Sequence, residues 1–493
     1  MQIPFGEWLP DQPEHGKQGA NVATNVYYAQ NTYKRFPSLV SYSTNAAGSE
    51  NSTGAGSFRD NSNTVYNFVS TTDNIYQLTS GAFTSRKASL TGNADDFWTF
   101  TQFGEYVIAS NGVDAVQFYL MGTSTNFAAL TSIQTAGTCP VFRVSGVVRD
   151  FLVTGNIVNS TNRIQWSGIN DITVWSGKQS DLQDLPGSGG QVVAITSGEV
   201  GYVFRQNQII RMDYVGGATV FRLSVISPNR GAMFGRTVCQ DNRRVFFYAD
   251  DGFYEISGDT VIPIGAEKVN RFFDLDLNKA YSDRICAAVD PFNQLAMWLY
   301  PSKNNTSNTT GICDRIIIYN YVTKKWSLAK ANASSIFSQF IGAYTVELMD
   351  ILSENLENIH ASLDTDFWSG GQMLLGGINE DYKAAIFSGT SNECEVETSE
   401  LEPFPGLRAN ITGVRPIVDA AATVTVKTRE RLADDKTESS SSSMVTSGIN
   451  PVRESGRYVR ANIKVASGTT FNHAQGVDLV ASRAGQRWVI KLI

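Results

Sequence analysis

One pattern limits the possible folds of this chain more than any other: two apolar runs joined by a polar turn recur along it. Clear examples are TVYNFVSTTDNIYQL at 64–78 and VFFYADDGFYEI at 245–256. The residues at the centres of the second runs are Tyr76, Phe118, Ile164, Ile210, Tyr254 and Ile318. Successive centres are 42, 46, 46, 44 and 64 residues apart. A hairpin every ~40 to 50 residues, with short strands between the hairpins, is the period of a β-propeller blade.

The number of blades stays open between six and seven. The long fifth gap contains PSKNNTSNTTGICD at 301–314, whose polar residues predict a surface loop. A seventh hairpin at 372–389 is less clear, because the span 333–362 before it fits either a helix or an irregular blade. We therefore predict an all-β protein with a β-propeller of six or seven blades over residues 51–394. The structural alternative is a β-sandwich array of unrelated hairpins.

The two ends of the chain fall outside the repeat. Residues 1–50 are rich in Pro, Asn and Tyr with little alternation, and they predict an extended N-terminal arm. Residues 395–493 predict a small C-terminal β-sandwich-like domain on which that arm packs. Within it, residues 403–493 hold 13 Lys and Arg against 7 Asp and Glu, which is +6, so the rest of a chain of net charge −7 carries −13. This balance argues against neutralisation of DNA phosphates over the whole surface.

Catalytic and metal-binding patterns are missing from the sequence. The three histidines, His15, His360 and His473, lie in three different regions, and neither a GxSxG nucleophile motif nor a phosphate-binding loop occurs. Asp250 and Asp251 are the obvious carboxylate pair for a glycosidase, but they adjoin a glycine in an expected hairpin turn, where Asp is common. We therefore expect no enzyme activity, no cofactor and no metal site.

The five cysteines predict buried, unpaired thiols. Their number is odd and neighbours lie at least 27 residues apart, so no CxxC motif can form. No stretch of 18 apolar residues occurs, and we expect no membrane segment.

An acidic run lies between the predicted propeller and the C-terminal domain. It consists of Glu395, Glu397, Glu400 and Glu402 within EVETSELE, and the alternation places at least the first two on one face of a strand. Such runs are most often solvated. The functional alternative is a ring of negative charge in an oligomeric channel, where repulsion keeps passing DNA from adhering to the wall.

Motifs at both ends of the chain carry a family resemblance. FGEWLPDQP at 5–13 and FPSL at 36–39 resemble the opening of virion proteins from short-tailed bacteriophages. GRYVRA at 456–461, FNHAQGVD at 471–478 and GQR at 485–487 resemble the ending of the same family. The chain is thus similar to the podophage tail nozzle, or packaged DNA stabilisation, family.

The resemblance implies a structural role. Members of that family carry a β-propeller and form a six-fold ring below the portal and the adaptor, through which double-stranded DNA leaves without sequence-specific binding. Expected partners are five further copies of the chain, the portal, the adaptor, a tail fibre or tailspike, and a tail needle or plug. The expected location is the virion tail, assembled in the cytoplasm of the host bacterium.

Two sets of residues follow as site candidates. The acidic run Glu395, Glu397, Glu400 and Glu402 supplies candidates for the DNA channel, whose wall we expect to be acidic or neutral. The candidates for partner interfaces are Phe5, Trp8, Arg457, Arg460 and Lys464. The alternative function is a propeller-type tail protein that binds a receptor or a carbohydrate, and a third class, a glycoside hydrolase, would lose its activity on Asp250→Asn.

Overall fold

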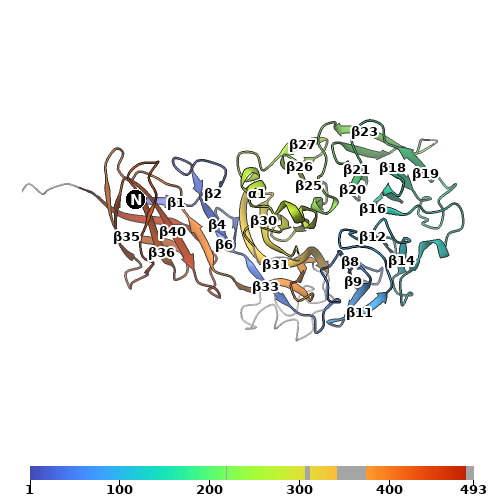
Figure 1. Ribbon diagram of the computed structural model, residues 1–493, viewed down its shortest axis with the longest axis horizontal. Helices are drawn as coiled ribbons and strands as arrows, with labels where there is room; N and C mark the ends of the chain where they lie inside the picture. The colour runs from blue at the N-terminus through green and yellow to red at the C-terminus, as the bar shows by residue number, and fades with distance from the viewer. Residues whose placement is uncertain (218, 306–310, 341–372, 485–493) are drawn as a thin grey trace, which may run out of the picture.

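The computed structural model describes residues 1–217, 219–305, 311–340 and 373–484, and the statements below concern these residues. A ring of β-sheets forms one part of the elongated molecule, and a two-sheet sandwich that contains the N-terminus forms the other (Figure 1).

Five four-stranded antiparallel sheets follow one another along the chain and make up most of the ring. Alternating apolar residues and short polar turns form each of them, as the repeat predicts. Their strands are β8 Gly54–Arg59, β9 Val65–Ser70, β10 Ile75–Thr79 and β11 Ala82–Lys87; β12 Thr99–Phe103, β13 Tyr106–Ser110, β14 Gln117–Leu120 and β15 Ala128–Ala129; β16 Phe142–Val148, β17 Phe151–Ile157, β18 Ser160–Trp166 and β19 Asp181–Asp184; β20 Val192–Ile195, β21 Val200–Arg205, β22 Ile209–Tyr214 and β23 Phe221–Ser227; β24 Cys239–Asp241, β25 Arg244–Ala249, β26 Gly252–Ser257 and β27 Thr260–Pro263.

One long strand, β31 (Lys325–Phe340), belongs to two further sheets. Up to Ala333 it pairs with β30 (Cys313–Asn320), which continues through β29 (Leu295–Tyr300) to β28 (Cys286–Asp290). From Ala333 onward it pairs with a second set of strands. These are β32 Met373–Asn379, β33 Ala384–Ser391 and β7 Pro37–Ser41.

The ring closes through its innermost strands. The first strands of neighbouring sheets contact each other from β8 through β12 and β16 to β20, and from β24 to β28; between β20 and the next sheet the short helix η2 (Gly235–Thr237) contacts both β20 and β25. The second half of β31 contacts both β28 and β8. The described residues therefore form a closed β-propeller with seven sheets, and the N-terminal strand β7 completes the seventh.

The central residues of the repeat occupy equivalent places in this ring. The near-constant spacing of the first five predicts matching positions in successive blades, and each of the six lies in the third strand of its sheet: Tyr76 in β10, Phe118 in β14, Ile164 in β18, Ile210 in β22, Tyr254 in β26 and Ile318 in β30. For the span 333–362, the described part is strand β31, and the remainder lies outside the described residues, as do 306–310 of the predicted surface loop.

Two sheets form the sandwich and enclose a shared apolar core. One sheet has the order β39-β35-β41-β6-β5, with β1 also on β41; the other contains β4-β34-β40-β36-β37, with β38 also on β36. The strands are β1 Gln2–Pro4, β4 Val22–Thr24, β5 Val26–Ala29, β6 Thr32–Arg35, β34 Cys394–Glu397, β35 Ala409–Val418, β36 Thr423–Arg429, β37 Thr437–Glu438, β38 Ser442–Ser443, β39 Asn450–Gly456, β40 Tyr458–Val465 and β41 Ala474–Arg483.

Residues 1–50 are therefore built into the fold more deeply than an extended arm would be. Besides the strands above they form β2 (Glu7–Trp8) and β3 (Gly19–Ala20), which pair with each other. Their strands are two to five residues long and broken by Pro, Gly and Asn, so no alternation long enough to recognise appears in the sequence.

Short helices fill connections in the ring. The described residues contain one α-helix, α1 (Asn270–Asp276). At its N-terminus the Asp11 carboxylate accepts hydrogen bonds from the Arg271 and Phe272 amides at 2.8 and 2.7 Å. The other short helices are η1 Leu130–Ser132 and η3 Lys279–Arg284. An N-terminal residue thus caps a helix of the propeller.

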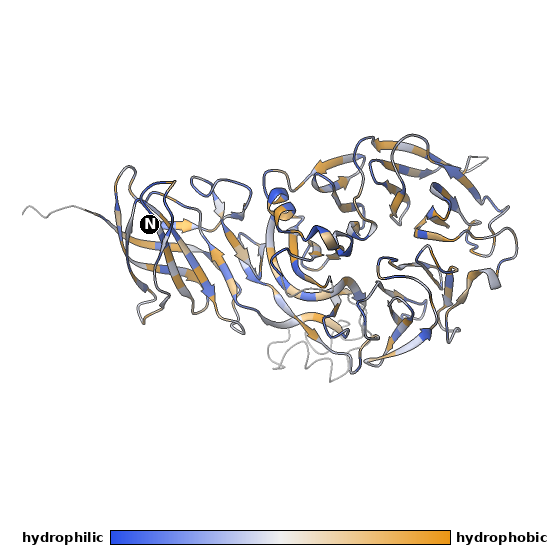
Figure 2. Cartoon of the chain, in the orientation of Figure 1, coloured by the Kyte–Doolittle hydropathy of each residue, from blue (hydrophilic) through white to orange (hydrophobic). Residues whose placement is uncertain are grey.

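A single apolar core crosses from the sandwich into the propeller. It joins Val424 and Ile463 of the sandwich to Trp326 and Phe253 of the propeller. Figure 2 shows hydrophobic and hydrophilic residues alternating along strands in both parts. All five cysteines are buried and unpaired, which confirms the expectation from their number and spacing.

Candidate functional site

The segments that carry the family resemblance at the two ends of the chain lie side by side. In β1 and β41, Ile3 is opposite Val477 and Pro4 is opposite Gly476, and the Phe5 amide donates to the Gln475 carbonyl at 3.0 Å. The close approach requires a glycine, because a Cβ atom on Gly476 would stand 2.3 Å from the Ile3 carbonyl oxygen.

Phe5 and Trp8 are anchors within the subunit. Both are buried. The Phe5 ring meets Tyr33 edge-on at 6.3 Å between centroids, and Trp8 meets Phe272 of α1 at 5.0 Å. Trp8 Nε1 also donates to the Asn21 carbonyl at 3.2 Å. Their assignment to a partner interface is therefore corrected: their own chain already covers both side chains.

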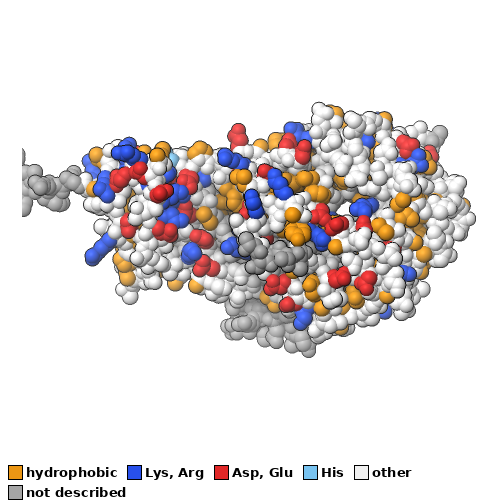
Figure 3. All heavy atoms as spheres, in the orientation of Figure 1, with side chains coloured by type: hydrophobic (Ala, Val, Ile, Leu, Met, Phe, Trp, Pro, Cys, Tyr) orange, Lys and Arg blue, Asp and Glu red, His pale blue; other side chains and the backbone are white. Residues whose placement is uncertain are grey.

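The acidic run and the basic C-terminal residues face each other within one sheet. Strand β34 pairs with β40 so that Glu395 is opposite Lys464, and β40 pairs with β36 so that Arg460 is opposite Lys427. Charged side chains are denser over the sandwich than over the outer blades of the propeller on the right of Figure 3. The ladder thus brings together two sets of residues that the sequence analysis assigned to different surfaces.

Opposite charges collect in the sandwich in what we call the ion cluster. Its members are Glu14, Glu397, Glu400, Lys427, Arg429, Lys436 and Arg460. Arg460 lies at its centre, with a side chain 3% exposed and nitrogen–oxygen distances of 2.8 Å to Glu397, 2.7 Å to Glu14 and 3.5 Å to Glu400. Lys427 pairs with Glu397 at 2.7 Å, and Arg429 pairs with Glu400.

The ion cluster lowers the pKa of two of its acids, Glu14 and Glu397. Burial by itself would raise the pKa of Glu14, but hydrogen bonds from Arg460 and Lys436 outweigh it and lower that pKa to about 2. Burial would likewise raise the pKa of Glu397, but hydrogen bonds from Lys427 and Arg460 outweigh burial and lower that pKa. Burial lowers the pKa of the neighbouring Lys17 to about 8.

The remaining candidates lie nearer the surface. Lys464 pairs with Glu393 at 2.9 Å and Arg457 with Glu402 at 2.7 Å. Glu395 accepts a hydrogen bond from the Asn462 amide at 2.6 Å. These pairs are accessible to solvent or partners, and Glu395 and Glu402 stay candidates for a channel wall.

Two assignments from the sequence are corrected by burial. Glu397 and Glu400 are buried and paired, so they present no charge on a wall, and Arg460 is buried between them and faces no partner. Alternation in TVTVKTR at 423–429 could have indicated that Lys427 and Arg429 share a face, but nothing in the sequence indicates that Glu14, 446 residues before Arg460, joins them.

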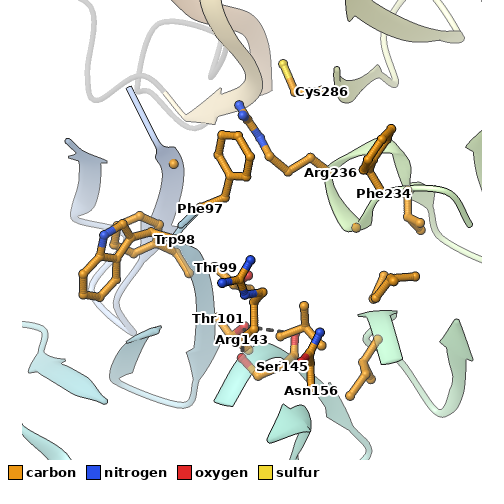
Figure 4. A pocket seen from close by; sticks show the side chains of 18 of the residues that line it. Phe97, Trp98, Thr99, Thr101, Arg143, Ser145, Asn156, Phe234, Arg236 and Cys286 are labelled. Atoms are coloured by element: carbon orange, nitrogen blue, oxygen red, sulfur yellow. Dashed lines mark hydrogen bonds between the residues drawn. The ribbon is translucent and has the colours of Figure 1, made fainter. Parts of the chain in front are cut away.

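The propeller encloses a central cavity of about 1180 Å³. Residues of the innermost strands of all seven sheets line it, among them Ala55, Thr99, Ser145 and Ile195. Figure 4 shows side chains from several of these strands pointing into the space, with Phe97 and Arg236 approaching each other from different walls. Both polar and apolar groups thus face the cavity.

The carboxylate and histidine candidates from the sequence have partners within the described residues. The Asp251 carboxylate pairs with Arg230 and accepts from the Tyr254 hydroxyl, each at 2.8 Å, in the turn between β25 and β26. The His15 ring packs edge-on against Tyr458. Within the described ranges there is no group of three or more His, Cys, Asp or Glu residues placed to hold a metal. No helix there has the length and apolar character needed to cross a membrane.

Comparisons with known proteins yield only distant structural likenesses. No protein-family model matches the chain, and no curated protein matches it. A chain in the crystal structure of the mitotic checkpoint complex is 11% identical at a TM-score of 0.40, over 71% of this chain and 93% of that one. The Pan2 WD40 domain of Neurospora crassa is 6% identical at 0.39, over 73% and 96%. The extracellular domain of the putative hybrid two-component system BT4673 from B. thetaiotaomicron is 9% identical at 0.39, over 76% and 41%.

Proposed function

We propose that the protein is a structural subunit of a short phage tail, the nozzle, of which six copies form a ring below the portal and the adaptor. The observation that carries the proposal is the contact between the motif segments at 5–13 and 471–478: the Phe5 amide donates to the Gln475 carbonyl at 3.0 Å, directly after the pairing of β1 with β41. The motif segments at 5–13 and 471–478 thus meet in the sandwich, while FPSL at 36–39 overlaps β7 of the seventh propeller sheet and GQR at 485–487 lies outside the described residues. The sandwich is then the part that docks on the rest of the tail.

The path of the chain links the sandwich and the propeller firmly, as expected of a subunit that must resist mechanical force. The polypeptide starts in the sandwich, contributes β7 to the seventh sheet, runs around the ring and returns to the sandwich through β34. Strand β4 pairs with both β31 and β34, so a continuous ladder connects the two parts. Pulling one part away from the other would require breaking both this ladder and the shared core.

In this proposal DNA passes along the axis between the six subunits. Retention and release of the genome need no sequence-specific contact, no cofactor and no catalytic step. The partly exposed Glu395 and Glu402 are the acidic side chains of the run that remain for the wall, and repulsion there keeps DNA from adhering. The portal, the adaptor, a fibre or tailspike and a needle or plug are the proposed partners in the virion tail.

The test is assembly of the full chain. We expect tagged full-length protein, produced with the portal and adaptor encoded in the same genome, to copurify with them at six copies per ring, each of 53.9 kDa. The control is the same chain produced without those two proteins. Native mass spectrometry and electron microscopy of the purified assembly give the stoichiometry. A chain that never joins the portal and adaptor would overturn the proposal.

The second candidate is a tail propeller that binds a receptor carbohydrate, and the central cavity is the observation that favours it. It predicts a trimer or monomer that binds whole cells through surface polysaccharide. Binding to intact host cells, lost after enzymatic removal of their polysaccharide and present without portal or adaptor, would favour this candidate.

A further inference from the structure

Arg236 is a cation in the central cavity that forms no ion pair with a carboxylate of the described residues. No described Asp or Glu oxygen lies within 4.0 Å of its guanidinium, and its Nη1 atom is buried without a hydrogen-bond partner there. The other arginines nearby differ: Arg143 pairs with Asp96 at 2.7 Å, and Arg284 pairs with Asp95 at 3.1 Å. A buried, unpaired polar group is costly and calls for an explanation.

The neighbours of Arg236 fix its position. Its guanidinium lies over the Phe97 ring at 4.4 Å from the centroid, and Arg284 lies near the same ring at 5.7 Å. Beside it stands the Cys286 thiol: burial raises the pKa of that thiol, and the charge of Arg236 opposes the rise. Figure 4 shows Phe97, Arg236 and Cys286 together at one side of the cavity. The guanidinium is thus held in place before any ligand arrives.

The acidic side chains near Arg236 do not form an ion pair with it, so an anion could bind there. Asp95 pairs with Arg284. Burial raises the pKa of Asp283, and the charges of Arg284 and Arg236 oppose that rise, but Asp283 forms no ion pair with Arg236. A guanidinium presents a planar set of N–H donors that matches the oxygens of a carboxylate or a phosphate. An oxyanion at this place would complete the pairing that the described residues leave open.

The rest of the cavity suits a small polar molecule that carries such a group. Apolar side chains of Phe234, Ile195 and Ile336 line it together with the polar Thr99 and Asn156. The volume of about 1180 Å³ slightly exceeds the range of about 300 to 1,000 Å³ usual for small-molecule sites. Arg143, Asp95 and Asp283 also line the cavity, but Arg143 and Asp95 already have ion-pair partners of their own. Apolar walls, a few polar groups and a cation without an ion-pair partner are typical of a site that orients a ligand through its charge.

We propose that the central cavity of the propeller binds a small polar organic molecule through an oxyanion, carboxylate or phosphate, that pairs with Arg236. This site is independent of the proposed assembly role, because it lies within one propeller and needs no second subunit. Its failure would leave the nozzle proposal untouched, and failure of tail assembly would not affect it.

The experiment measures binding of three sugars of similar size to the purified full chain by calorimetry. Glucuronic acid carries a carboxylate, glucose 6-phosphate carries a phosphate, and glucose carries neither. We expect at least one of the two anionic sugars to bind about tenfold or more tightly than glucose. Which of them binds more tightly identifies the oxyanion.

Variants assign the binding to the guanidinium. We expect Arg236→Gln to remove the preference for the anionic sugars and Arg236→Lys to retain part of it, because lysine keeps the charge but not the planar donors. Arg163→Gln is the matched control: it makes the same change in net charge in an exposed pair with Asp184. Unfolding curves check that each variant is folded. If Arg236→Gln does not fold, Arg236→Lys is used to assign the binding.

Two results would overturn the inference. One is wild-type protein that binds neither anionic sugar more tightly than glucose. The other is an anion preference that persists in a folded Arg236 variant or disappears equally in Arg163→Gln, since either would place the anion elsewhere.

Discussion

At the residue scale, Arg460 has the most demanding environment of the predicted site residues. Its guanidinium is buried between two buried carboxylates, Glu397 and Glu400, and also reaches Glu14. Removing a charge from water is costly, and only the multiple contacts within the ion cluster offset that cost. The cluster therefore stabilises the sandwich only while its partners are all present.

Replacing Arg460 by Met tests this dependence. We expect Arg460→Met to lower the free energy of unfolding by about 3 to 5 kcal/mol, because it leaves two buried carboxylates without their shared partner. Urea unfolding of the full chain measures the change. The matched control is Arg457→Met, whose side chain is 42% exposed in its pair with Glu402 and whose loss should leave the midpoint almost unchanged. Equal effects of the two variants would contradict the assignment.

Glu14 gives the ion cluster a dependence on pH. Its pKa is about 2 in the folded protein against an ordinary value of 4.5, so its contribution to stability is present above pH ~4.5 and is lost as the pH falls toward 2. The side chain is 44% exposed, and water screens part of the effect. We expect melting temperatures to fall between pH 5 and pH 2.5, and to fall less steeply in Glu14→Gln. Parallel curves for the two proteins would show that Glu14 does not cause the loss.

At the element scale, short strands from residues 1–50 complete sheets that the rest of the chain leaves open. Strand β1 covers β41, β4 lies between β31 and β34, and β7 covers β33. Each forms few hydrogen bonds of its own. Their position depends on close backbone contacts, of which Gly476 against Ile3 is the tightest in the β1 pairing.

Substitution of Gly476 should displace β1. We expect Gly476→Val to cost about 1 to 3 kcal/mol of stability, because its side chain would overlap the backbone of Ile3 and Pro4. Hydrogen exchange of the Phe5 amide, which bonds to Gln475, should become faster. The control is Gln475→Val, next to it but exposed on the surface. Unchanged exchange in Gly476→Val would show that β1 tolerates the side chain.

At the scale of the whole molecule, the propeller and the sandwich share one core and one ladder. Trp326 and Phe253 of the ring belong to the same apolar cluster as Ile463 and Val424 of the sandwich. Residues near the N-terminus also touch the propeller directly, since Asp11 caps α1 and Lys268 pairs with Glu7 at 2.8 Å. Removing the first 20 residues would therefore disturb both parts.

The shared core predicts cooperative unfolding. We expect one calorimetric transition for the full chain, and we expect Arg460→Met, which lies in the sandwich, to shift that transition as a whole. Fluorescence of the buried Trp298 and Trp326 and far-ultraviolet circular dichroism should change at the same temperature. Two separated transitions, with only the lower one moved by Arg460→Met, would show that the parts unfold independently.

Local periodicity alone was enough to predict the repeating part of the fold. Apolar runs, turn residues and a spacing of 42 to 46 residues predicted the repeated sheets and matching positions for the central residues of the hairpins, which lie in the third strand of each sheet. The odd number and wide spacing of the cysteines predicted free, buried thiols. These features follow from the order and spacing of residues along the chain, and so they could be predicted without knowledge of the fold.

Contacts between distant segments decided the rest. The passage of β31 from one sheet to the next at Ala333, and the completion of the seventh sheet by β7, depend on which backbone edges meet when the ring closes. The pairing of Glu397 with Arg460 depends on the register of β34 against β40, and Glu14 joins them from the far end of the chain. A charge in a sequence shows no partner. Burial and pairing arise only when the sheets pack, and for this reason the ion cluster could not be foreseen from its separate segments.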